Sequence, residues 1–131
     1  MKRIHGHKVL VILVLLLFIN LPFVSALEIS NVRAEDVTDT SARILWDTDD
    51  TGDSFVDYGL DTENLRTVGD AAKVTEHSIQ LSELQPETEY VFSVESNEIV
   101  NDNDGNLYSF MTFAPDTDAP MIDTTLPEFV S

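Results

Sequence analysis

His77 is the only imidazole in the body of this chain. The sequence has three histidines, and His5 and His7 stand within the first ten residues. There is no cysteine, so a thiolate metal site and a disulfide framework are both excluded. Hydrolytic zinc centres mostly need more than one imidazole, and a histidine base needs a positioned nucleophile. Because His77 alternates with Ile79 and Leu81, we expect a half-buried structural histidine and no catalytic residue.

Two short acidic runs superficially resemble calcium-binding loops. They are 47–53 (DTDDTGD) and 101–105 (NDNDG). The EF-hand loop opens and closes on oxygen ligands. The first run would close on Tyr58, and the second would open on Val100. We therefore expect solvated turns with no metal and no other cofactor, and a calcium-stabilised module remains the alternative.

The charge balance excludes another class of function. The chain of 131 residues has 24 acidic and seven basic residues, a net charge of −17, and its length suits one domain. Such a surface repels phosphate backbones, so nucleic-acid binding is not expected. Self-repulsion of this kind also favours a soluble monomer.

The N-terminus has the pattern of an export signal. Residues 1–8 carry three basic residues and no acid, and an apolar run follows from Val9 to Ile19. Pro22 and a small-residue end at Val24–Ala26 complete the secretory pattern. We predict a signal peptide over 1–26 with cleavage after Ala26, and an uncleaved membrane anchor is the alternative. The mature chain would carry 24 acidic against four basic residues, a net charge of −20.

From Glu28 onward the pattern is that of strands. β-Branched and aromatic residues recur in short alternating runs between clusters of Asp, Asn, Gly, Ser and Thr, and no stretch keeps helical spacing. This predicts an all-β domain over 27–114, a seven-stranded sandwich. A polar loop is expected at 48–53 and a hairpin turn at 101–105. The expected strands lie at 29–37, 42–47, 56–58, 65–68, 77–81, 90–94 and 110–112.

Four motifs within this region carry a family resemblance. They are Ser41–Trp46 (SARILW), Val56–Gly59 (VDYG), His77–Leu81 (HSIQL) and Leu84–Tyr90 (LQPETEY). In this order and spacing they resemble a fibronectin type III domain, an immunoglobulin-like sandwich. More narrowly, they resemble the variant found in microbial surface proteins and at the N-terminus of purple acid phosphatases. The resemblance covers essentially all of 27–114, and it implies that the Tyr90 hydroxyl bonds to upstream backbone near residues 84–87.

The alternation and the resemblance together predict a core and an outer face. On the third, sixth and seventh strands, the inward alternation turns four apolar residues outward. We expect them to form one contiguous patch that docks a neighbouring domain, and coverage by the chain's own tail is the alternative. The expected structural core is Trp46, Tyr58, Leu84, Pro86, Tyr90 and Phe92, and the expected docking patch is Phe55, Val91, Met111 and Phe113.

The last residues differ in character from the domain. Residues 115–120 (PDTDAP) indicate an extended, self-repelling linker. Residues 121–131 resemble the first strand of a further immunoglobulin-like domain. We favour a piece of a longer multi-domain chain, and a small secreted protein with an adhesive C-terminal segment is the alternative.

These observations point away from an enzyme. The predicted function is a non-catalytic adhesion or spacer module of an exported cell-surface or secreted protein, and its partners would be neighbouring domains of the same or another surface protein. A membrane contact is expected only if the signal segment is retained. The alternative is the accessory N-terminal domain of a secreted hydrolase of the purple acid phosphatase type. In that case the catalytic domain is absent, because Gly69-Asp70 does not continue into a metal motif.

Overall fold

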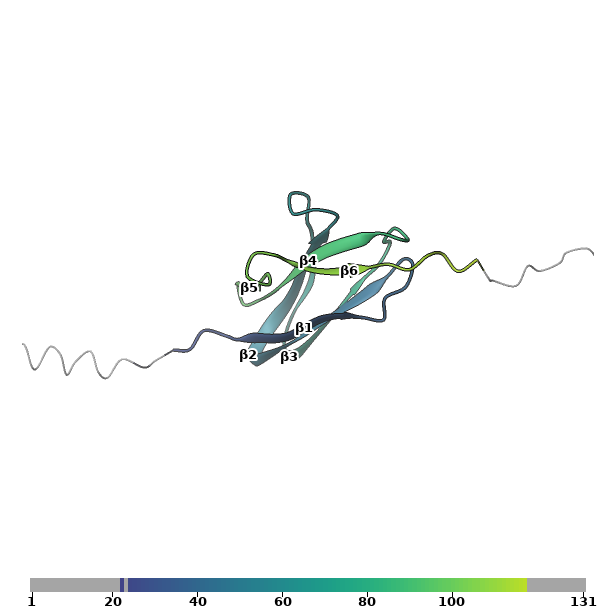
Figure 1. Cartoon of the computed structure of the whole chain (residues 1–131). Helices are drawn as coiled ribbons and strands as arrows, with labels where there is room; N and C mark the ends of the chain where they lie inside the picture. Colours follow the sequence, from purple (N-terminus) through teal and green to yellow (C-terminus); the bar gives the residue numbers. More distant parts are fainter. Residues whose placement is uncertain (1–21, 23, 118–131) are drawn as a thin grey trace, which may run out of the picture.

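The computed structural model describes residue 22 and residues 24–117, and its regular structure over these residues is entirely β-strand (Figure 1). The predicted signal peptide therefore lies almost wholly outside the described residues, as do residues 118–131 of the tail. No helix in the described part is long and apolar enough to cross a membrane. The strands are β1 (Ile29–Glu35), β2 (Ala42–Gly59), β3 (Arg66–Leu81), β4 (Glu89–Ser96), β5 (Ile99–Asn101) and β6 (Tyr108–Met111).

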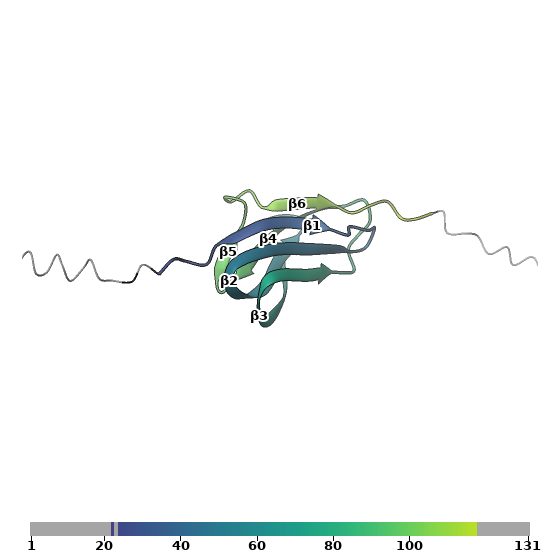
Figure 2. The ribbon, with the colours of Figure 1, turned by 90° about the horizontal axis from the view of Figure 1, so that it is seen from below.

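The strands form a curled antiparallel sheet whose two halves face each other as layers. In one layer, the first half of β2 pairs with β1 and with the second half of β3. In the other layer, the second half of β2 pairs with the first half of β3 and with β4, which also pairs with β5 and β6. Figure 2 shows β1, β2 and β3 side by side with β4 behind them.

The predicted count of seven strands is not confirmed. The second and third expected strands are one continuous strand, β2, and the fourth and fifth are one continuous strand, β3. The short strand β5 was not expected at all. The described residues thus hold six strands, two of which are long enough to belong to both layers.

The expected polar loop at 48–53 is wrong, because these residues belong to β2. The strand pairing is nevertheless irregular here. Asp47 pairs with Glu76, but the next paired residue of β2 is Gly52, opposite Val74. More residues of β2 than of β3 lie between these pairs, so the strand bulges and bends. The bulge is where β2 passes from one layer to the other.

The core lies between the layers, where the alternation of the sequence predicts it. Trp46 and Phe92 are each 1% exposed and Tyr58 and Tyr90 each 7%. Leu84 is buried as well, whereas Pro86 is half-buried. Stacked and tilted rings join Tyr58, Tyr90, Phe110, Phe92 and Tyr108 into one aromatic row.

The corner between β3 and β4 is closed by a tyrosine. The backbone N–H of Gln85 donates to the Tyr90 hydroxyl at 2.9 Å, within the stretch that the resemblance implied. Thr112 adds a second link, since its hydroxyl donates to the carbonyl of Gln85 at 2.6 Å and accepts from the N–H of Thr88 at 2.9 Å. The corner is therefore fixed to both β4 and the end of β6.

The two ends of the domain lie far apart. The chain enters beside β1 and leaves after β6, at opposite ends of the long axis of the sandwich in both views (Figures 1 and 2). Among the described residues, the first hydrogen bond to the rest of the domain comes at Glu28, whose N–H donates to the Asp49 carboxylate at 2.8 Å. Residues 24–26 before it are exposed, and so are residues 113–117 at the other end.

Candidate functional site

His77 lies in a buried polar cluster at the bend of β2. Thr48 and Ser54 flank the bulge on β2, and β3 supplies the histidine opposite them. These hydroxyls continue the inward alternation of Trp46 and Val56, so they occupy core positions of the strand. His77 is 2% exposed and Ser54 4% exposed. His77 is therefore fully buried, whereas the sequence predicts that it is half-buried.

The hydrogen bonds of the cluster define the state of the imidazole. Thr48 Oγ1 lies 2.9 Å from His77 Nε2, and Ser54 Oγ lies 2.7 Å from Nδ1. The Thr48 hydroxyl donates to the carbonyl of Asp50 at 2.7 Å, so it must accept from Nε2–H. Nδ1 then accepts from the Ser54 hydroxyl. The network fits a neutral imidazole with its proton on Nε2.

The surroundings of His77 disfavour the charged form of its imidazole. Burial lowers the pKa of the imidazole from its ordinary value of 6.5, and the more distant charges of Asp47 and Asp53 oppose this shift without reversing it. A serine paired with a histidine is the beginning of a nucleophilic dyad. Here the pair is sealed in the core, the serine binds Nδ1, and the other ring nitrogen binds a threonine and no carboxylate.

The cluster continues into a link between three strands. The Trp46 indole stacks on the His77 ring with centroids 4.8 Å apart and planes 6° from parallel. The indole N–H donates to Ser96 Oγ on β4 at 3.0 Å, and the Ser96 hydroxyl donates to the carbonyl of Asp53 at 2.7 Å. Within the described residues no side-chain N or O atom is both buried and without a hydrogen-bond partner. The arrangement is that of a satisfied structural network.

The two acidic runs are used locally by the fold. In the first run, the Asp53 carboxylate binds Lys73 Nζ at 2.8 Å and the N–H of Asn97 at 2.7 Å. These two hydrogen bonds lower the pKa of Asp53. In the second run, the Asp102 carboxylate accepts from the N–H of Gly105, whose φ of 84° closes the turn. Among the described residues, no three His, Asp or Glu side chains lie close enough to hold a metal ion.

The four residues of the expected docking patch lie on one face of the sheet, but they do not form one contiguous patch. The register puts Phe55 opposite Glu95 of β4, and Met111 opposite Glu89. Six residues of β4, roughly 20 Å, separate these two rows. Phe55 is half-buried over Gly69, where a Cβ would lie 2.1 Å from its Cδ1. The prediction of one contiguous patch is therefore wrong for Phe55.

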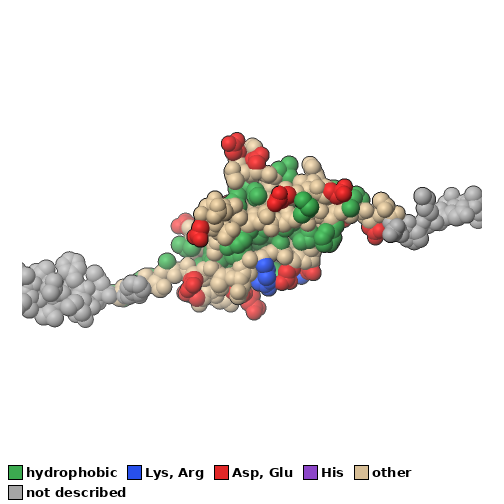
Figure 3. Space-filling model, viewed as in Figure 1, with side chains coloured by type: hydrophobic (Ala, Val, Ile, Leu, Met, Phe, Trp, Pro, Cys, Tyr) green, Lys and Arg blue, Asp and Glu red, His purple; other side chains and the backbone are tan. Residues whose placement is uncertain are grey.

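The other three residues stay together at the far end of that face. Val91 is half-buried and lies diagonal to Met111, which is 60% exposed, and Phe113 follows at 63% exposed. We call these three the β6 apolar cluster. In the space-filling view, hydrophobic atoms gather between β1 and β6 and towards the point where the chain leaves the domain, with acidic atoms and one group of basic atoms around them (Figure 3).

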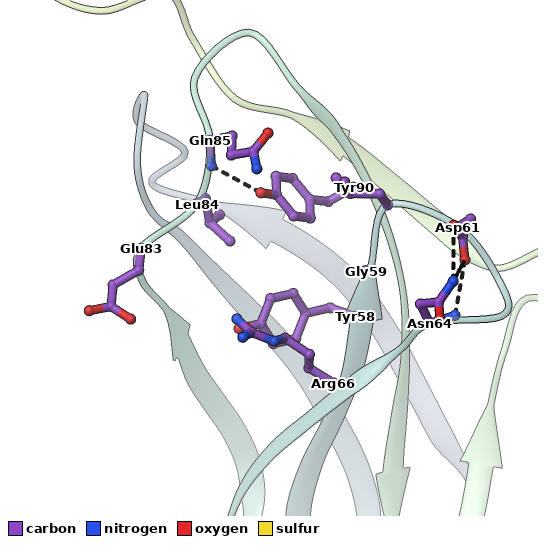
Figure 4. Close-up of a pocket in the computed structure, with 10 residues that line it drawn as sticks. Tyr58, Gly59, Asp61, Asn64, Arg66, Glu83, Leu84, Gln85 and Tyr90 are labelled. Carbon is purple, nitrogen blue, oxygen red and sulfur yellow. Dashed lines mark hydrogen bonds between the residues drawn. The ribbon is translucent and has the colours of Figure 1, made fainter.

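A pocket of about 430 Å³ opens at the end of the sandwich that carries the tyrosine corner (Figure 4). Its walls come from the end of β2, the following loop, the start of β3 and the corner before β4. Arg66, Glu83 and Asp61 bring charge to it, and Tyr58 and Leu84 bring aromatic and apolar surface. Sequence reasoning missed this pocket, because its walls lie far apart along the chain.

The comparison with protein families settles the identity of the domain. The family model of the fibronectin type III domain matches residues 27–110. The chain belongs to the fibronectin type III family. The match is to the general family, so the narrower variant shared with purple acid phosphatases stays a prediction. No curated protein matches the chain.

Solved structures agree on the fold of this fibronectin type III domain. The sensor domain of the anti-sigma factor RsgI4 of Pseudobacteroides cellulosolvens is 20% identical, with a TM-score of 0.55 over 81% of this chain and 89% of that one. A myokine structure is 21% identical, with a TM-score of 0.57 over 68% of this chain and 99% of that one. At such identities the likeness shows the fold alone.

Proposed function

We propose that this fibronectin type III domain is a non-catalytic adhesion or spacer module of an exported cell-surface or secreted protein. The observation that carries the proposal is the opposite placement of its two ends along the sandwich (Figure 1). When the polypeptide chain enters a domain at one end and leaves it at the other, the domain adds its full length to a multi-domain protein. The linker-like composition of 115–120 is consistent with that use.

The chemistry of the described residues supports a role without catalysis. The serine, threonine and histidine that might have formed a reactive group are buried and satisfied by one another. One structural neighbour is the sensor domain of an anti-sigma factor. Export is supported by the N-terminal pattern of the sequence.

Export can be tested through Lys73, the only lysine after residue 26, whose side chain is 54% exposed. A membrane-impermeant amine reagent applied to intact cells should label the chain. Mass spectrometry should place the label on Lys73 and on the amine of Leu27, because the chain is expected to begin there. A Lys73→Arg variant leaves only the terminal label. Labelling that requires cell lysis would contradict export. A chain that is labelled on intact cells but still begins at Met1 would show that the signal segment is retained as an anchor.

Adhesion can be tested separately at the β6 apolar cluster. Beads coated with the chain should be retained on the cells that produce it, and the double variant Met111→Ser, Phe113→Ser should lose this retention. A matched control is Val74→Ser, Val100→Ser, since Val74 and Val100 are 38% and 52% exposed and lie outside the cluster. Equal loss of retention in both double variants would show that the retention is non-specific hydrophobic adhesion. If beads coated with the parent chain are not retained, only the spacer role remains.

A further inference from the structure

The pocket at the tyrosine corner contains a cation without an ion pair. The described residues include four basic side chains, and three of them are paired with acids. The Arg66 side chain alone forms no ion pair or hydrogen bond with the described residues, although acids are abundant on this chain. The three pairs are Arg33–Glu35 at 2.6 Å, Arg43–Asp36 at 2.9 Å and Lys73–Asp53 at 2.8 Å.

The same pocket contains a hydroxyl without a partner. Tyr58 is 7% exposed, yet its hydroxyl forms no hydrogen bond with the described residues. No polar side-chain atom there is both fully buried and unpartnered, so this hydroxyl must reach open space. The open space beside Tyr58 is the pocket that it lines. In Figure 4 the polar ends of Tyr58 and Arg66 both point to the side where Glu83 lies.

These two groups together favour a carboxylate. A guanidinium presents a planar fork of donors that matches two carboxylate oxygens, and a phenol adds one more donor. The neighbouring acid Asp61 is already occupied, because its carboxylate accepts from the backbone N–H groups of Glu63 and Asn64 at 2.9 Å each. These bonds lower the pKa of Asp61. Of the two acids that line the pocket, only Glu83 has a carboxylate without a hydrogen-bond or ion-pair partner among the described residues.

The apolar residues that line the pocket indicate what the rest of the ligand is like. Leu84 is buried and Leu60 is 56% exposed, and both line the pocket. A volume of about 430 Å³ lies in the lower part of the range for small-molecule sites. We propose that this pocket binds a small ligand that joins a carboxylate to an apolar body. Arg66 and the Tyr58 hydroxyl bind the carboxylate, and the two leucines contact the apolar part.

The test is a titration of the ¹⁵N-labelled chain followed by NMR. Benzoate and benzamide have the same shape and differ in charge, so they separate carboxylate recognition from apolar contact. Benzoate should shift the amide signals of Gly59, Leu60 and Gln85, and benzamide should leave them almost unchanged. N-acetylleucine and its amide repeat the comparison for the carboxyl end of a peptide. Tighter binding of N-acetylleucine would assign the ligand to peptides, and tighter binding of benzoate would assign it to small aromatic acids.

Variants assign the effect to the named groups. Arg66→Gln should weaken benzoate binding about tenfold or more, because a charge-assisted hydrogen bond is lost. Arg43→Gln changes the net charge equally at an ion-paired site outside the pocket and should have no effect. Tyr58→Phe should weaken binding about threefold and leave the melting temperature unchanged or slightly raised, since the hydroxyl has no partner in the fold. Glu83→Gln should strengthen binding.

Three results would overturn the inference. One is equal shifts with benzoate and benzamide, which would indicate apolar contact alone. Another is equal weakening by Arg66→Gln and Arg43→Gln, which would indicate a general effect of charge. The third is a clear loss of stability in Tyr58→Phe, which would assign the hydroxyl to the fold. None of these results bears on export or adhesion, so this inference can fail independently of the proposed function.

Discussion

His77 shows how a titratable side chain can be placed in a core at little cost. Both of its ring nitrogens have hydroxyl partners, and the Trp46 indole covers one face. A buried polar group that is fully hydrogen-bonded avoids the desolvation penalty of an unpartnered one. The network has room for one proton on the imidazole, since Thr48 already donates to the carbonyl of Asp50. A second proton on the imidazole would lie on Nδ1, where it would point at the Ser54 hydroxyl that now donates to this nitrogen.

The stability of the domain should therefore fall as the pH is lowered through the range of histidine. Burial lowers the pKa of His77 in the folded state below its ordinary value of 6.5. Below that value the unfolded chain binds the proton more readily, so the free energy of unfolding decreases until the pH passes the folded pKa. Urea unfolding between about pH 7.5 and about pH 5 should show this decrease.

The control for this pH dependence is His77→Gln, which keeps a polar side chain but removes the titration. Its curve should be flatter than that of the parent over the same range, because most carboxylates stay ionised there. NMR titration of the parent should also place the imidazole pKa below its ordinary value. Parallel curves for parent and variant, or an imidazole that titrates at its ordinary value, would contradict the assignment.

Trp46 should be the most costly single truncation in the core. It is 1% exposed, stacks on His77 and donates to Ser96. Trp46→Ala should lower the free energy of unfolding by about 3–5 kcal/mol, a large part of the 5–15 kcal/mol typical of such domains. Trp46→Phe keeps an aromatic face over the imidazole and should cost less. Val100→Ala, at an exposed position, should stay within about 0.5 kcal/mol of the parent in urea unfolding. A Trp46→Ala variant as stable as Val100→Ala would refute the core assignment.

At the scale of the strands, local pattern predicted the faces well and the lengths poorly. Alternation is a property of neighbouring residues, so the inward side of Trp46, Tyr58 and Phe92 could be predicted from spacing alone. The continuity of β2 through 48–53 could not be predicted from spacing, because it depends on the pairing of β2 with β3. The sequence does not display that pairing. The run of Asp, Thr and Gly there has the composition of a loop.

The polar cluster and the pocket were missed for a related reason. Ser54 and His77 are 23 positions apart, and the walls of the pocket come from four separate segments. One signal was present, however. Thr48 and Ser54 continue the inward alternation of β2, and small hydroxyl residues at core positions imply a buried hydrogen-bond partner.

The contact between Phe55 and Gly69 offers a test of the pairing of β2 with β3. The two residues lie opposite each other, and a Cβ at position 69 would lie 2.1 Å from Phe55 Cδ1 and 2.5 Å from the Ser54 carbonyl oxygen. Gly69→Ala should therefore overpack the strand pair and lower the free energy of unfolding by about 1–3 kcal/mol.

The double variant Phe55→Leu, Gly69→Ala separates the two contacts in a denaturation experiment. The smaller side chain at position 55 removes the ring contact but leaves the carbonyl contact, so part of the loss should be recovered. A Gly69→Ala variant as stable as the parent would show that Phe55 does not lie over this glycine.

The whole molecule is dominated by like charge. A net charge of −17 destabilises the compact state through self-repulsion, and three ion pairs of the described residues offset only a small part of it. Salt screens such repulsion over distances near 10 Å at about 0.1 M. Any cation should therefore stabilise the domain to some degree. An increase in stability on adding calcium would not by itself demonstrate a calcium site.

The comparison of calcium with magnesium at equal concentration resolves this point. Both ions screen alike, but a calcium site needs several converging oxygen ligands, and the described residues hold no such group. The melting temperature should thus rise equally with either ion and return to its starting value with a chelator. An ion held at a hundred times its dissociation constant would add about 2.7 kcal/mol, or roughly 10–20 °C for a domain of this size. A calcium-specific rise of that order, abolished by Asp50→Asn or Asp102→Asn, would instead establish the acidic runs as a metal site.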